Sequence, residues 1–147
     1  MATFKLPKNV EDIQEPELLP EDWYRLRIST EPKAELNKAK TGSNIVLEFR
    51  VVSDNPEYNG RGFKKWLSLP STADEQKTTA MGGTVADFKS KMIAAFVSAF
   101  NGEEVTGDEI NLDQGMEAMF YVVTQLSQDQ SREINALDDK NAPRPVE

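Results

Sequence analysis

The chain has 147 residues, with 25 acidic and 17 basic side chains, a formal net charge of −8, and neither cysteine nor histidine. This length predicts one domain that buries enough surface to fold without a disulfide or metal. The missing residue types exclude thiolate nucleophiles, Cys- or His-based metal sites and Ser–His catalysis. No apolar run is long enough to span a membrane or to form a signal peptide, so we expect a cytoplasmic protein without a membrane partner.

The two ends of the chain differ in composition from its centre. Residues 1–20 are acidic and interrupted by prolines, and they predict an extended arm. Residues 138–147 are acidic, polar and contain two prolines, which predicts a disordered tail. The expected domain therefore covers residues 21–137.

Two strands open this domain. Apolar side chains at every second position of residues 24–28 form the period-2 pattern of a half-buried strand. After a polar segment over residues 29–44, the β-branched and aromatic run 45–52 predicts a second strand. Its odd-numbered apolar positions are expected to face the core, whereas Glu48 and Arg50 face outward.

A third strand and one helix follow. Turn residues between positions 54 and 60 predict a hairpin onto residues 63–69, a strand that Pro70 ends. Beyond a polar connector, Thr84 is a helix N-cap candidate and Gly102 a stop signal. Four residues with a spacing of four predict a single apolar stripe that faces the core: Phe88, Met92, Phe96 and Phe100.

The last two predicted strands cover residues 116–125 and 132–137, which gives the order β-β-β-α-β-β. Five strands with one helix between the third and the fourth is the element order of an OB-fold, a small, partly open Greek-key barrel. We therefore predict a mainly β protein with a five-stranded OB-fold-like barrel, whose bottom the helix closes. A generic α+β sheet packed on one helix is the alternative.

The net charge is unevenly distributed. Residues 25–65 hold nine basic and five acidic side chains, a local charge of +4, which leaves −12 for the rest of the chain. Such an asymmetry indicates a face that binds a polyanion. Basic groups that contact phosphates, interleaved with aromatic groups that stack on bases, are typical of proteins that bind single-stranded nucleic acid.

The strand alternation places several of these side chains together. We expect Arg25, Arg27, Arg50, Lys64 and Trp66 on one outer sheet face, with Trp23 beside them and Tyr58 and Phe63 near its edge. A lysine-bearing loop after the first strand would lie over this face. The candidate nucleic-acid-binding residues are Arg25, Arg27, Lys33, Lys38, Lys40, Arg50, Tyr58, Arg61, Lys64 and Trp66.

One alternative concerns the register of the third strand. The predicted register points Lys65 inward, and a slip by one residue would exchange Lys64 with Lys65 and bury Trp66 in the core. No nucleophile–base pair, phosphate-binding loop or cofactor motif is present, so we expect neither an enzyme nor a cofactor. The adjacent carboxylates at 103–104, 108–109 and 138–139 lack a partner motif, and we expect no metal site.

Several short motifs resemble a family of phage and prophage proteins. They are the strand entry Leu18–Ile28, Thr41-Gly42-Ser43-Asn44, Val51-Val52 and Tyr58-Asn59-Gly60-Arg61, all within residues 18–70. The family is that of single-stranded DNA-binding proteins from phage replication and recombination gene sets. The resemblance implies single-stranded DNA as the partner, together with other replication or recombination proteins.

We therefore predict a non-catalytic, sequence-tolerant single-stranded DNA-binding protein of phage type that forms homo-oligomers in the host cytoplasm. One alternative is a protein-interaction or virion structural module that uses the same sheet edge for assembly. The other is a metal-dependent nuclease built on loop carboxylates such as Asp108.

Overall fold

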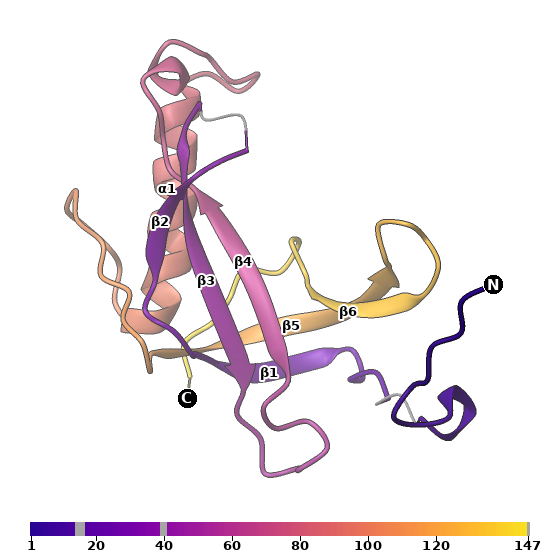
Figure 1. Cartoon of the computed structure of the whole chain (residues 1–147). Helices are drawn as coiled ribbons and strands as arrows, with labels where there is room; N and C mark the ends of the chain where they lie inside the picture. The colour runs from indigo at the N-terminus through magenta and orange to yellow at the C-terminus, as the bar shows by residue number, and fades with distance from the viewer. Residues whose placement is uncertain (14–16, 39–40, 147) are drawn as a thin grey trace.

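The computed structural model describes residues 1–13, 17–38 and 41–146 (Figure 1). Its principal elements are β1 (Asp22–Ile28), β2 (Lys33–Leu36), β3 (Ser43–Val51), β4 (Gly62–Ser68), α1 (Val85–Asn101), β5 (Glu117–Leu126) and β6 (Glu133–Leu137). Two short 3-10 helices, η1 (Val10–Asp12) and η2 (Ala73–Glu75), lie in the N-terminal arm and before α1. The fold is mainly β with one long helix, as the sequence predicts.

The strands form one antiparallel sheet in the order β2-β3-β1-β5-β6, and β4 pairs with the other edge of β3. In Figure 1, β3 and β4 run side by side and cross the direction of β1 and β5 steeply. β1 and β2 pair with successive parts of the same edge of β3, since Ile28 lies opposite Phe49 and Lys33 opposite Val46. Residues 29–32 therefore interrupt one long edge as a bulge.

The predicted five-stranded barrel is wrong in two respects. The sheet has six strands, because the polar segment after β1 contains β2, a short strand whose four residues are all exposed. The sheet is also open, because no pairing joins β4 to β6 within the described chain. Lys65 of β4 faces inward at this opening, with its Nζ 5.7 Å from the ring centroid of Phe96 and 3.9 Å from Asp139.

Helix α1 begins and ends where the sequence predicts. The Thr84 hydroxyl accepts a hydrogen bond from the Asp87 amide at 3.1 Å, which is the expected N-cap. At the other end, Gly102 has φ 71°, and its amide donates to the carbonyl of Ser98. A residue without a Cβ adopts this left-handed conformation readily, so the helix stops there.

Only half of the predicted apolar stripe of α1 enters the core. Phe96 and Phe100 stack around Phe120, with ring centroids 5.7 and 5.9 Å away, whereas the side chains of Phe88 and Met92 are mostly exposed. A helix with 3.6 residues per turn rotates about 40° over every four-residue step, so Phe88 and Phe100 point about 120° apart. Side chains with this strict four-residue spacing therefore turn away from the core towards the N-terminal end of the helix.

The core lies between α1 and the inner face of the sheet. Its centre is aromatic, with Phe49 of β3 and Phe120 of β5 5.1 Å apart between ring centroids. The other fully buried side chains are aliphatic: Leu19, Leu26, Ile28, Leu47, Val51, Val97 and Val122. Inward and outward side chains alternate along β1, β3 and β5, as the period-2 pattern predicts.

The folded unit is longer at both ends than the predicted range of residues 21–137. Leu19 is buried, and its amide and carbonyl groups bond to the side-chain amide of Asn135 at 2.8 and 3.0 Å. At the other end, residues 138–146 do not form the expected disordered tail but follow the free edge of β5. The Asp138 amide bonds to Tyr121, and Arg144 exchanges two backbone hydrogen bonds with Met119. Residues 1–13 are exposed and include the short helix η1.

Among the described residues, none of the helices combines the length and the apolar character needed to cross a lipid bilayer.

A partly buried ion pair ties η2 to α1. The Lys89 Nζ donates to Asp74 Oδ2 at 2.8 Å, and the Ser71 amide donates to the same oxygen at 3.0 Å. These bonds favour the ionised carboxylate and lower the pKa of Asp74 to about 2 from its ordinary 3.8.

We expect this pair to make stability depend on acid pH. A carboxylate with a lowered pKa stabilises the native state above its unfolded pKa, and this contribution disappears as the pH falls from about 4 to about 2. Chemical denaturation of Asp74→Asn should therefore show a loss of stability at pH 6 that vanishes near pH 2. Glu75→Gln, at the exposed neighbouring position, serves as the control and should change little at either pH. An equal loss for Asp74→Asn at both pH values would contradict this role of the charge.

Candidate nucleic-acid interface

The outward side chains of β1, β2, β3, β4 and β5 form one continuous surface, which we call the outer face. The register places Trp66 of β4 opposite Val46 of β3, and Arg50 of β3 opposite Arg27 of β1. The predicted register of the third strand is therefore confirmed: Trp66 faces solvent and its neighbour Leu67 is buried. The outer face carries five basic side chains (Arg25, Arg27, Lys33, Arg50 and Lys64) and three acidic ones (Glu35, Glu48 and Glu117).

Arg50 lies at the centre of the outer face. Its Nη1 donates to the carbonyl of Gly60 at 3.2 Å, so the side chain extends across β4. A Cβ at position 62 would stand only 2.8 Å from this nitrogen, which means that Gly62 leaves the space that the guanidinium occupies. Gly62, the second glycine of the Gly60-Arg61-Gly62 turn, thus allows the Arg50 guanidinium to lie on the sheet surface.

Acidic side chains partly neutralise this surface. Glu117 of β5 accepts two hydrogen bonds from Arg25 and lies 3.5 Å from Arg27 Nη2. The hydrogen bonds from Arg25 lower the pKa of Glu117, and those bonds in turn raise the pKa of Arg25. On the neighbouring strands, Glu48 Oε1 lies 3.8 Å from Lys64 Nζ. The three cations keep about half of their side-chain surface exposed and can still reach a ligand.

Trp66 is the most prominent aromatic side chain of the outer face, with 55% of its surface exposed. The Nζ of Lys64 lies 5.4 Å from its ring centroid, within the range of a cation–π contact. The ring borders a hollow of about 460 Å³ that Lys38 also lines. An adjoining hollow of about 340 Å³ includes both Lys33 and Lys64. The lysines at positions 33 and 38 thus belong to the surface around Trp66, as the sequence predicts.

Two predicted site residues lie elsewhere. The ring of Tyr58 packs edge-on against Tyr24 at 6.0 Å, next to the core. Arg61 is half-buried and donates to the carbonyl of Glu57 at 3.1 Å. The positions of Tyr58 and Arg61 both follow from the β3–β4 connection, which turns these side chains to the core side of the hairpin. Lys40 lies outside the described residues.

A second aromatic site lies at the opposite end of the outer face, where Trp23, which the sequence analysis expected on this face, meets Tyr121, which it did not assign. Trp23 of β1 faces Tyr121 of β5, with ring centroids 5.5 Å apart in an edge-to-face arrangement. The period-2 alternation of the predicted strand, which puts Tyr121 on the face opposite Phe120, is the signal that could have identified Tyr121. The strand pairing that brings it to Trp23 is a long-range feature that no local pattern contains.

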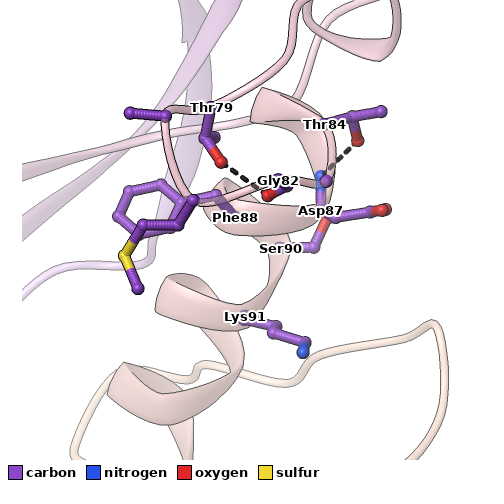
Figure 2. Close-up of a pocket in the computed structure, with 10 residues that line it drawn as sticks. Thr79, Gly82, Thr84, Asp87, Phe88, Ser90 and Lys91 are labelled. Atoms are coloured by element: carbon purple, nitrogen blue, oxygen red, sulfur yellow. Dashed lines mark hydrogen bonds between the residues drawn. The ribbon is translucent and has the colours of Figure 1, made fainter.

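A hollow of about 570 Å³ lies away from the outer face at the N-terminal end of α1 (Figure 2). The exposed side chains of Met81 and Phe88 make its wall apolar. Its loop is held by the Thr79 hydroxyl, which donates to the carbonyl of Gly82 at 2.6 Å. Asp87 places a negative charge in the first turn of the helix, where a bound phosphate would need positive potential.

The carboxylate pairs found in the sequence gain no third ligand from the fold. Over residues 1–13, 17–38 and 41–146, no three acidic side chains come together as a possible metal site. No known family model matches the chain, and no curated protein is significantly similar to it. The resemblance of residues 18–70 to phage single-stranded DNA-binding proteins therefore stays a prediction that rests on those motifs.

The opposite orientations of Trp66 and Leu67 predict very different effects on stability. We expect Leu67→Ala to lower the free energy of unfolding by about 2–5 kcal/mol, because it opens a cavity in the core. Trp66→Ala should cost at most about 1 kcal/mol, the size of a cross-strand contact with Val46. Urea denaturation of both variants measures the difference. Equal losses would mean that Trp66 belongs to the core.

Proposed function

We propose that this protein binds single-stranded DNA through its outer face, without sequence preference and without catalysis. The observation that carries the proposal is the exposed Trp66 ring among Lys64, Lys33 and Lys38. An exposed indole on a sheet offers a flat surface on which any base can stack. The neighbouring ammonium groups are placed to neutralise phosphates on either side of such a base.

We further propose that the fold is an open variant of the OB-fold. If β1 and β2 are counted as one bulged strand, the pairings of the sheet follow the OB order, with α1 between the third and the fourth strand. The ligand-binding strands of OB-folds are the second and the third, which correspond to β3 and β4 here. Those two strands carry Arg50, Lys64 and Trp66, which agrees with the proposed interface.

The resemblance of residues 18–70 supports a role in phage DNA replication or recombination in the host cytoplasm. In that setting the protein would cover single strands and work beside other replication or recombination proteins. The acidic residues outside the outer face would keep the protein soluble and repel DNA from its other surfaces.

A titration with oligo-dT at two salt concentrations tests the function directly. We expect tryptophan fluorescence to be quenched on binding, and the affinity to fall with a log–log salt slope of about −0.7 per neutralised phosphate. Absence of binding at low salt, or binding that ignores salt, would contradict the proposal.

Single substitutions separate stacking from phosphate contact. Trp66→Ala should cost about 1–3 kcal/mol of binding free energy with little change in the salt slope. Lys64→Ala and Arg50→Ala should each weaken binding and make the slope less steep by about 0.7. Lys91→Ala, which removes a charge from the exposed side of α1 near the hollow of Figure 2, is the matched control. If this control weakens binding as much as Lys64→Ala does, the interface has been misplaced.

The alternative function, a protein-interaction or virion structural module, has one observation in its favour. Met81, Phe88 and Met92 expose 98%, 57% and 58% of their surfaces around the N-terminal half of α1. Exposed apolar groups that lie together indicate a contact surface for another protein. A stable oligomer in analytical ultracentrifugation, combined with no affinity for oligo-dT, would favour this function over DNA binding. A homo-oligomer that also binds oligo-dT agrees with the main proposal.

A further inference from the structure

The end of the outer face far from Trp66 carries the second aromatic pair, Trp23 and Tyr121. Two rows of outward positions lie between this pair and Trp66. On β4 the row is Trp66, Lys64 and Gly62. On β1 it is Arg27, Arg25 and Trp23. Arg50 connects these two rows, because it pairs with Gly62 on one side and Arg27 on the other. A basic path therefore joins the two tryptophans of the chain.

Trp23 is covered in a specific way. The edge-to-face contact with Tyr121 occupies one side of the indole, and the guanidinium carbon of Arg144 lies 4.1 Å from the ring centroid. Two backbone hydrogen bonds to Met119, of 2.7 and 2.8 Å, hold Arg144 in register with β5. Beside the ring is a hollow of about 390 Å³ lined by Arg25, Met119 and the residues that follow Arg144.

The Arg144 guanidinium occupies the indole face over which it lies. A base that stacks flat on that face of Trp23 must take the place of this guanidinium. The backbone bonds to Met119 do not have to break for this exchange, because the flexible Arg144 side chain can rotate away. A cation–π contact and a base stack use the same indole face, so they exclude each other.

We propose that Trp23 is a second base-stacking position of the outer face, closed by Arg144 in the free protein. The inference rests on the proposed single-stranded DNA binding and adds to it a ligand position and a residue that competes for it. A strand that reaches both tryptophans would then be held at Trp66 and would displace Arg144 at Trp23.

Removal of the competing side chain tests the inference. Arg144→Ala should bind oligo-dT of about 16 nucleotides roughly two- to fivefold tighter, because displacement of a surface cation–π contact is no longer required. The measurement is made at salt concentrations at which phosphate contacts are weak, so that the lost positive charge matters little. The gain should disappear in Arg144→Ala/Trp23→Leu. Lys140→Ala, a charge removed from an exposed position of the same segment, should produce no gain.

A second readout observes the ring itself. In Trp66→Phe, Trp23 is the only tryptophan left, so its fluorescence reports on that position alone. We expect oligo-dT to quench it, and to do so at lower concentration when Arg144→Ala is added.

The outcomes separate this inference from the proposed function. If the parent protein binds oligo-dT but Arg144→Ala binds no tighter, and Trp23 fluorescence does not respond, the inference is wrong and the proposed function stands. If the parent protein binds no oligo-dT at all, the proposed function itself fails. Tighter binding by Arg144→Ala that persists in the Trp23→Leu background would also overturn the inference, because the gain would not come from the indole.

Discussion

The pairing of β3 with three other strands is the constraint on which the rest of the structure depends. β2 and β1 share one of its edges and β4 covers the other, so the orientation of every side chain on β3 fixes that of its neighbours. Leu47 and Phe49 are almost completely buried, which commits Glu48 and Arg50 to the opposite surface. A slip of one residue would expose the core side chains and bury the charges, so the hydrophobic effect selects a single register.

The outer face follows from this register, but its electrostatic character is more balanced than its basic residues alone imply. Glu48 of β3 and Glu117 of β5 each lie next to one or more of the cations. Salt bridges at such exposed positions contribute little to stability. Their effect is to orient the arginine and lysine side chains and to reduce the charge available for nonspecific attraction, while Trp66 stays accessible.

The charged side chains of the acidic C-terminal segment contact the folded sheet. Asp138 and Asp139 lie beside the opening between β4 and β6, where Asp139 approaches Lys65. The one arginine of the segment, Arg144, crosses to the outer face and covers Trp23. Charges of the two signs in this short segment therefore act on opposite sides of the sheet. Within the described residues, side chains such as Lys65 and Asp139 line the opening of the sheet, and no strand pairing closes it.

The sequence by itself determined the features that depend on neighbouring residues. The period-2 alternation along β1, β3, β4 and β5 is local, so the mainly β class could be predicted. The same alternation predicts a common face for Arg25, Arg27, Arg50, Lys64 and Trp66. The Thr84 cap and the Gly102 stop are also local, and they predict the bounds of the helix. Only the tertiary structure decided the features that depend on distant residues. Pairing with β3 makes a strand of the wholly exposed β2, and the packing geometry turns Phe88 and Met92 outward. Glu117 and Arg144 reach the outer face through contacts with residues more than ninety positions away, which no local pattern records.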